Sequence, residues 1–310
     1  MTRSEANRYI SDYYYNNNPS EDDKFLFVEA HRFLIDTYHD PRDMHNLAFF
    51  YLEQRRHDLE QKYLEMAAEY KYPPALEDLG YIWYYGQNGE VDYKKAFEYF
   101  SLASESGDDV VKAWSLHKLA DMYHNGFYVN KDETKYRQMI EDLYDWIMNP
   151  GELHSMYPQP ELRFPFSDVF YRLAKIRANQ GRVDEAMKLL HDARVRLSED
   201  IRDNPSWWGD IEVIERVVRL EHELDQGNSR RFNIYDLCWI ADAECKVAFL
   251  YHQRRFIVEV TNDPDSVKNV IKYDGKWYRT VREFLEKAEL DGKKLVFLYD
   301  VLYNFEVNYG

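Results

Sequence analysis

A short pattern of a leucine, a small residue and an aromatic residue recurs along the chain and limits the folds that it can adopt. The three copies are Leu47-Ala48-x-x-Tyr51, Leu79-Gly80-x-x-Trp83 and Leu119-Ala120-x-x-Tyr123. A second run of helical character follows each copy, as expected for paired-helix repeats. Because one helix pair cannot bury its apolar face alone, such copies must stack. The sequence therefore predicts helix hairpins over about residues 42–147.

Small residues mark the surfaces where the paired helices are expected to touch. Gly80 and Ala120 lie on the first helices and allow a partner helix to approach closely. Ala96 and Ala103 are two turns apart on the second helix of the middle copy and form a stripe with the same effect. Phe100 lies beside that stripe and is expected to be buried.

Glycines are placed where the helices of the repeats should end. Gly86 and Gly126 follow the first helices of the middle and third copies. Each is expected to adopt the left-handed conformation that terminates a helix, and Gly107 is expected to do the same after the second helix of the middle copy.

The middle copy, residues 75–107, closely resembles a Sel1-like repeat, a relative of the tetratricopeptide repeat. The positions that carry the resemblance are Leu79, Gly80, Trp83, Gly86, Val91, Asp92, Lys95, Ala96, Tyr99, Phe100, Ala103 and Gly107. The outer copies depart from the pattern, with Gln54 in place of the loop glycine and Tyr136 in place of an alanine. The resemblance implies an α-solenoid that acts as a non-catalytic adaptor and binds a protein or peptide, without a cofactor.

Further helices are expected on both sides of the repeats. Ser20 and the acidic residues after it start a helix that should run to about Tyr38. A helix pair and a last helix are expected over about residues 163–226, and Gln226-Gly227-Asn228-Ser229 marks a boundary. Residues 1–230 are thus predicted to form a helical array.

The last 80 residues change character and are predicted to form a small α+β module, residues 231–310. Two β-hairpins are expected, 246–251 with 255–260 and 270–273 with 276–279. Asp274-Gly275 is a strong signal for the turn of the second hairpin. A helix over residues 280–290 and a final strand within 295–307 should complete the module, which resembles no family known to us.

The charge is strongly acidic and unevenly distributed. The chain has 40 basic and 56 acidic residues, a net charge of −16, and residues 1–230 account for −15 of it. Such a body repels phosphate backbones and anionic lipid, which argues against nucleic-acid and membrane partners and leaves basic proteins as candidates. Residues 1–23 are polar and lack the apolar core of a signal peptide, and Cys238 and Cys245 cannot form a disulfide framework, so a cytoplasmic location is expected.

The candidate binding residues lie on the first helices of the middle and third copies. They are Tyr84, Tyr85, His117, Asp121 and His124. Exposed tyrosines provide a large contact area with a polar tip, which suits protein recognition. The last three residues lie four and three positions apart, on one helix face, where a divalent metal is an alternative to a partner's basic side chain. A solvent-facing polar stripe explains them more simply, and no metal is predicted.

Two further function classes remain open. An acidic inhibitor or immunity-type protein that neutralises a basic enzyme, such as a nuclease, is one, because the array can imitate the charge of a nucleic acid. The other is an enzyme with a site near Tyr273, Asp274, Lys276, Tyr278 and Arg279, although a hairpin turn already explains that cluster. The chain has no phosphate loop, dinucleotide fingerprint, H-E-x-x-H or G-x-S-x-G motif.

Overall fold

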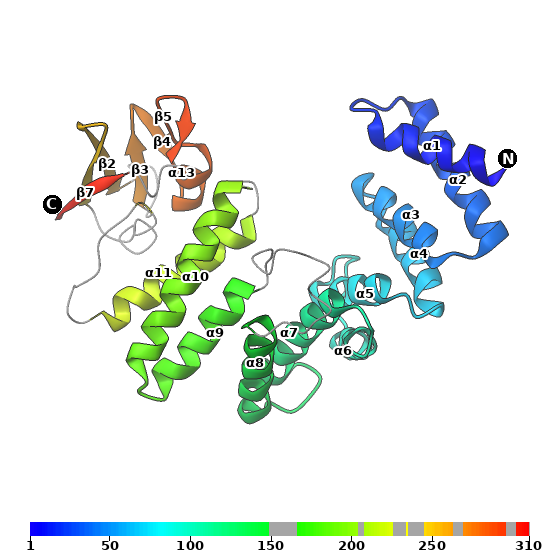
Figure 1. The fold of residues 1–310 in the computed structure, drawn as a ribbon, viewed down its shortest axis with the longest axis horizontal. Helices are drawn as coiled ribbons and strands as arrows, with labels where there is room; N and C mark the ends of the chain where they lie inside the picture. Colours follow the sequence, from blue (N-terminus) through cyan, green and yellow to red (C-terminus); the bar gives the residue numbers. More distant parts are fainter. Residues whose placement is uncertain are drawn as a thin grey trace. The chain divides into compact units, whose positions relative to one another are not determined.

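A computed structural model of the chain describes residues 1–148, 166–203, 208–225, 234, 245–262, 269–295 and 302–309. The chain divides into two compact units, Met1–Met139 and Ile140–Gly310, and the division falls within helix α8. Figure 1 shows paired helices through most of the chain and strands near its C-terminus. The expectation of a mainly helical chain of repeated hairpins, followed by a small α+β region, is confirmed.

The first unit is built from consecutive antiparallel helices. They are α1 (Arg3–Tyr15), α2 (Glu21–Tyr38), α3 (Pro41–Glu53), α4 (His57–Glu69), α5 (Pro73–Tyr85), α6 (Tyr93–Ser104), α7 (Asp109–Asn125) and α8 (Glu133–Met148). The helix expected from Ser20 to Tyr38 is α2, and Ser20 caps it in a reciprocal capping box with Asp23.

Helix α1 is one element that the sequence did not reveal. It is polar and buries one side chain completely, that of Ala6, against α2. Thr2 caps it and forms a capping box with Glu5, which is a local start signal that apolar periodicity does not report.

The middle hairpin, α5–α6, packs as its small residues predict. A Cβ atom added at Gly80 would lie 2.5 Å from Cε1 of Phe100, whose ring is fully buried. Gly86 ends α5 in the left-handed conformation, with φ of 65°, and Asp92 caps α6 by accepting from the backbone N–H groups of its first turn. Close approach and loop geometry are therefore both fixed by single residues.

The expectation for Gly107 is wrong. Helix α6 already ends at Ser104, with Glu105 as its C-cap at φ of −87°, and Gly107 has no positive φ. The next helix begins at Asp109, where Asp108 accepts hydrogen bonds from the N–H groups of Val110 and Val111. Gly107 thus lies in the short connection between two helices and terminates neither.

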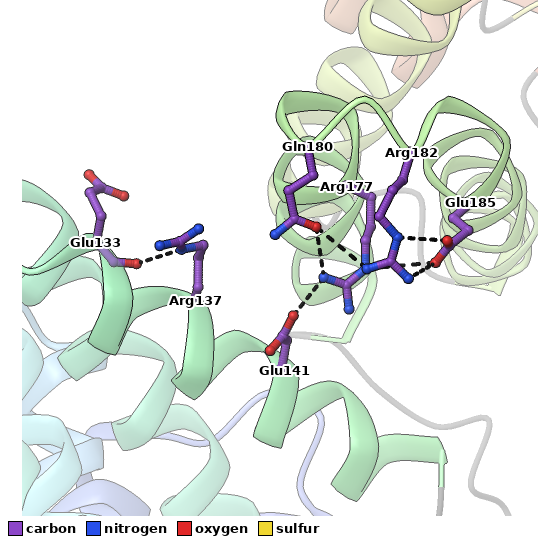
Figure 2. A network of polar contacts seen from close by, with 7 residues as sticks. All are labelled: Glu133, Arg137, Glu141, Arg177, Gln180, Arg182 and Glu185. Carbon is purple, nitrogen blue, oxygen red and sulfur yellow. Dashed lines mark hydrogen bonds and ion pairs between the residues drawn. The ribbon is translucent and has the colours of Figure 1, made fainter.

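The second unit begins with the end of α8 and continues through α9 (Phe166–Asn179), α10 (Val183–Asp203) and α11 (Trp208–Leu224). Figure 2 shows Arg177 of α9 bridging Glu141 of α8, at 2.6 Å, and Gln180, at 3.3 Å. Arg182 binds Glu185 at the start of α10 through two guanidinium nitrogens. The contact of Arg177 with Glu141 joins α8 to α9 within the unit, and the other contacts lie around the connection between α9 and α10.

The C-terminal strands form a five-stranded antiparallel sheet in the order β4-β3-β2-β1-β7. Their bounds are β1 Cys245–Tyr251, β2 Arg254–Asn262, β3 Asn269–Tyr273, β4 Lys276–Tyr278 and β7 Tyr303–Tyr309, with a separate pair, β5 Glu289–Leu290 and β6 Lys293–Lys294. Both predicted hairpins are present. His252-Gln253 and Asp274-Gly275 make their turns with positive φ at both positions, so the first turn is one residue shorter than expected.

The helix predicted over residues 280–290 is shorter. Helix α13 spans Val281–Lys287, capped by Thr280, and the chain then enters β5. Phe284 is fully buried and packs edge-on against Tyr273 and Tyr278, which places α13 on one face of the sheet. The sheet interaction of Glu289–Leu290 overrides the helical pattern at the end of this segment.

Two remaining expectations concern the cysteines and membrane insertion. Cys245 is a buried free thiol on β1, and burial raises its pKa, while Cys238 lies outside the described residues. Within the part of the chain that the structure describes, no helix combines the length and the apolarity needed to cross a bilayer.

Candidate functional site

A cluster of tyrosines and charged residues lies where α5 meets α7 in the first unit. We call it the tyrosine face, and its members are Glu77, Tyr81, Tyr84, Tyr85, Lys118 and Asp121. Glu77, Tyr81 and Tyr85 follow one another at intervals of four residues, so they lie along one side of α5. Lys118 and Asp121 are one turn apart on α7. The repeat geometry therefore brings the two helices' polar residues together.

Lys118 is the centre of the tyrosine face. Its ammonium nitrogen lies 5.7, 5.4 and 5.3 Å from the ring centroids of Tyr81, Tyr84 and Tyr85, and it donates a hydrogen bond of 2.8 Å to the Tyr85 hydroxyl. Asp121 pairs with it at 3.6 Å. The lysine side chain is only 12% exposed. Three π-systems and a carboxylate thus stabilise a largely desolvated cation in this place.

Glu77 is the acidic residue of the tyrosine face on α5, two helical turns before Tyr85. Burial, followed by repulsion from Asp78 and Asp108, raises its pKa to about 8. Among the described residues Glu77 makes neither an ion pair nor a hydrogen bond. A carboxyl group near other carboxylates and without a cationic partner is costly to ionise, so this position would gain from an external positive charge.

Tyr81 lies between Glu77 and Tyr85 on α5, and its ring is one of the three around Lys118. Its ring stacks in parallel with that of Tyr85, at 6.1 Å, and meets Phe100 edge-on. Burial, and then the charge of Glu77, raises the pKa of Tyr81 far above its ordinary range. Its hydroxyl is buried and has no hydrogen-bond partner among the described residues. The hydroxyl is therefore a neutral donor at working pH that no described group uses.

The structure places the residues chosen from the sequence in three different settings. Tyr84, Tyr85 and Asp121 come together around Lys118, and Tyr85 is 54% exposed. His117 is only 4% exposed, so it belongs to the packed side of α7 and offers no contact surface. His124 lies apart, paired with Glu133 and against the ring of Tyr136.

Sequence reasoning missed the two charged residues that organise the face. Glu77 lies two residues before Leu79, at the repeat position that His45 and His117 occupy in the other copies. Lys118 lies one residue before Leu119, at the repeat position of Asp78, and reaches Tyr85 from the neighbouring copy. Aligning the copies would have drawn attention to Glu77, but the contact of Lys118 with the tyrosines depends on the packing of α7 against α5.

Two other lysine–aromatic contacts are part of the repeat itself. Lys95 lies 3.6 Å from the ring centroid of Trp83, and Lys135 lies 4.0 Å from that of Tyr123. The backbone N–H groups of Asp92 and Asp132 donate to the carbonyl oxygens of the same two aromatic residues. Because the arrangement recurs in both copies, it secures the loop of each hairpin and does not distinguish a binding site.

The alternatives with a metal or a catalytic centre find no support in the described residues. No group of three or more histidine, cysteine, aspartate or glutamate side chains gathers there in a way that would hold a metal ion. In the C-terminal module, Asp274 makes a hairpin turn, and Tyr273 and Tyr278 pack against Phe284. These residues have structural tasks in the sheet.

Comparison with known proteins identifies the repeats. Residues 73–108 and 115–135 match the Sel1 repeat model, and these ranges correspond to α5–α6 and to most of α7 with the start of α8. The chain therefore contains Sel1-like repeats. Such repeats are commonly scaffolds for protein–protein interaction, and proteins built from them are typically non-catalytic. No protein of curated function matches the chain.

Two solved structures are similar to the chain at low sequence identity. One is a Sel1 repeat protein from Oxalobacter formigenes, 16% identical, with 74% of this chain and 94% of that chain covered and a TM-score of 0.39. The other is a protective antigen of uropathogenic Escherichia coli strains that displays an SLR fold, 15% identical, with 77% of this chain and 58% of that chain covered and a TM-score of 0.40.

Proposed function

Because the chain contains Sel1-like repeats, we propose that it is a non-catalytic adaptor whose tyrosine face binds a basic segment of a partner protein or peptide. The observation that carries this proposal is Glu77. Its carboxyl group is partly buried near the carboxylates of Asp78 and Asp108, with no cation paired to it among the described residues. An arginine or lysine of a partner would supply the missing charge.

The charge balance of the face supports a cationic ligand. Because Asp121 neutralises Lys118, the lysine opposes an incoming cation less, and a cation beside Glu77 would favour the ionised form of its carboxyl group. A guanidinium group, with its several N–H donors and flat face, fits the combination of the Glu77 carboxyl group and the tyrosine rings better than an ammonium group.

The tyrosines supply contact area around the charged centre. Tyr85 is more than half exposed, and its ring packs edge-on against that of Tyr84 at 4.9 Å. Aromatic side chains held in place by their neighbours bind at a low cost in conformational entropy. In this proposal Tyr84 and Tyr85 contact the partner and Asp121 fixes Lys118, whereas His124 contacts Glu133 and Tyr136 and takes no part.

The rest of the chain frames this surface. In the proposal residues 1–230 are the binding array and residues 231–310 cover its C-terminal end, which a repeat array needs for solubility. A contact between α13 and α11 within the second unit supports this arrangement. A reducing compartment such as the cytoplasm suits the free thiol of Cys245.

An acidic inhibitor of a basic enzyme is the second candidate. The net charge of −15 over residues 1–230 and the proximity of the carboxyl groups of Glu77, Asp78 and Asp108 favour it. The two functions differ in their dependence on salt. An inhibitor that imitates a nucleic acid uses many exposed charges and weakens steeply with ionic strength, whereas an adaptor anchored at one partly buried carboxylate weakens little.

The test is binding of the full chain to an array of random twelve-residue peptides, followed by affinity measurements on the peptides retained. We expect the retained peptides to share an arginine or lysine flanked by apolar residues. Glu77→Gln and Tyr85→Ala should each weaken binding about tenfold, the effect of losing one charge-assisted contact or one aromatic anchor.

Tyr70→Ala is the matched control, because Tyr70 is exposed to a similar degree, 50%, and lies at the end of α4, away from the face. It should bind like the wild type. Retained peptides without a basic residue, or equal binding by Glu77→Gln and the wild type, would refute the proposal. A steep loss of affinity between low and high salt, shared by all variants, would favour the inhibitor.

A further inference from the structure

A second polar site lies at the beginning of the chain, away from the tyrosine face. Helices α1, α2 and α3 border a cavity of about 250 Å³ that is open to solvent and lined by Arg3, Asn7, Leu34, Tyr38, Asp40, Arg42, Asp43 and Asn46. Every lining residue belongs to the first unit. The apolar floor is the buried side chain of Leu34. The cavity is large enough for a few heavy atoms of a ligand.

Hydrogen-bond donors reach the cavity from two helices in the same spacing. Arg3 and Asn7 are four residues apart on α1, and Arg42 and Asn46 are four residues apart on α3. Each pair therefore projects from one side of its helix. The structure thus presents two guanidinium groups and two side-chain amides toward one small volume.

Most of these donors are unused within the described part of the chain. Arg3, Asn7 and Asn46 make no side-chain hydrogen bond and no ion pair there. Arg3 is nevertheless held in position, because its guanidinium carbon lies 4.8 Å from the ring centroid of Tyr38. Stacking on an aromatic ring fixes the plane of the guanidinium group and leaves its N–H donors available.

The two carboxylates of the cavity are already engaged. Asp43 pairs with the Nδ1 atom of His31 at 3.0 Å. Asp40 accepts from Nε and Nη2 of Arg42 and from its backbone N–H, as the N-cap of α3. These hydrogen bonds with Arg42 hold the pKa of Asp40 below its ordinary value. The charge of Arg3 also lowers the pKa of Asp40, but among the described residues neither carboxylate accepts a hydrogen bond from Arg3 or the two amides, so these donors remain available to a further acceptor.

We propose that this cavity binds a carboxylate group of a partner, carried either by an acidic side chain or by a chain terminus. Arg3 receives the carboxylate through two parallel N–H donors, the geometry that guanidinium and carboxylate share. Asn7 and Asn46 donate to the remaining lone pairs, and the side chain of Arg42 lines the same cavity. This ligand is an anion, whereas the ligand proposed for the tyrosine face is a cation. An experiment can therefore refute one proposal without affecting the other.

The experiment measures binding of three probes to the isotope-labelled full chain by the side-chain N–H signals of Arg3, Asn7 and Asn46. The probes are acetyl-pentaalanine with a free C-terminal carboxylate, the same peptide amidated, and an amidated peptide of the same length with a central glutamate. We expect saturable shifts with a carboxylate probe and none with the amidated pentaalanine. Binding to the first probe alone identifies a chain terminus, and binding to the third identifies an acidic side chain.

Two substitutions separate recognition from folding. Arg3→Gln should weaken binding about tenfold, because it removes the positive charge and the paired N–H donors of the guanidinium group. Arg8→Gln is the matched control, since Arg8 also lies on α1 and over a tyrosine ring, at 5.0 Å from Tyr9, but outside the cavity. Asn46→Ala tests α3 without altering α1. Equal shifts with the amidated peptide, or wild-type affinity in both Arg3→Gln and Asn46→Ala, would overturn the proposal.

Discussion

The first and middle hairpins, α3–α4 and α5–α6, solve one packing problem with different residues. In the middle hairpin Gly80 faces the large ring of Phe100. At the equivalent positions of the first hairpin are Ala48 and Leu64, both buried in one cluster. A smaller residue on one helix accompanies a larger one on the other. The comparison shows that combined volume at the interface is what the repeat retains.

The loops of the two hairpins also differ in the residues that shape them. The middle hairpin uses Gly86 at positive φ and the capping carboxylate of Asp92. The first hairpin has a shorter loop, with Arg55 at φ of 56° and no side-chain cap at Arg56. The middle hairpin therefore has the better local signals, which is also why its sequence matches the repeat pattern more closely.

On the polar side the two hairpins differ in charge. His45 of the first hairpin pairs with Asp78 at 2.8 Å, whereas Glu77, at the same repeat position of the middle hairpin, has no partner among the described residues. Packing positions thus vary in pairs that compensate, while this polar position varies without compensation. We interpret the uncompensated position as the functional one.

The largest expected effect comes from removing the carboxyl group of Glu77. Burial and neighbouring carboxylates raise the pKa of Glu77 from 4.5 to about 8, so the folded state binds its proton more tightly than the unfolded state. The stability that Glu77 contributes is therefore fully present below pH 4.5 and is lost as the pH rises through 8. Glu77→Gln should be more stable than the wild type by up to about 5 kcal/mol at pH 9 and equal to it near pH 4.

Urea unfolding of both proteins at several pH values measures this difference. His45→Gln is the comparison within the first hairpin, and because its ion pair with Asp78 is partly exposed, it should change stability by only about 0.5 kcal/mol. If Glu77→Gln and the wild type have parallel pH profiles, Glu77 is ordinarily solvated and the contrast between the hairpins disappears.

The next effect tests compensation in the core. Gly80→Ala places a methyl group against the Phe100 ring and should destabilise the protein by about 2 kcal/mol, despite the higher helix propensity of alanine. Combined with Phe100→Leu, it recreates the pair found in the first hairpin. The double variant should recover about 1 kcal/mol relative to the sum of the single changes. Additive losses in thermal unfolding would show that the two positions do not compensate.

The smallest effect concerns the loops. Arg55→Gly should stabilise the first hairpin by about 0.5 kcal/mol, because it removes the strain of a non-glycine residue at positive φ, partly offset by the flexibility of the unfolded chain. Gly86→Ala should cost about 1 kcal/mol for the reverse reason. Denaturation midpoints measure both, and effects of the same sign would contradict the assigned loop conformations.

The repeated hairpins were predictable because their signals are local and redundant. Leu79, Gly80 and Gly86 each mark a buried face, a close contact or a helix end, and the structure confirms all three. Helix α1 was not predictable in this way because it is polar and its stability depends on α2. Leu290 left its predicted helix because a strand partner, Lys293, competes for it.

The tyrosine face was only half predictable. Tyr84, Tyr85 and Asp121 were found from their residue types, and the structure brings them together. The burial of His117 was not predictable, because a polar stripe on a repeat helix does not reveal which neighbour covers it. The role of Lys118 depends on contacts with α5 of the preceding copy, which no local pattern reports.

The contact between Gly80 and Phe100 has a consequence for how such arrays change over time. A helix carrying an alanine at the position of Gly80 clashes with a phenylalanine partner, and a leucine opposite Gly80 leaves a void. Single helices are therefore not interchangeable between the hairpins of this chain. Duplication, deletion or recombination that moves a hairpin as a whole preserves its matched pair, so the hairpin is the smallest piece that can be inherited intact.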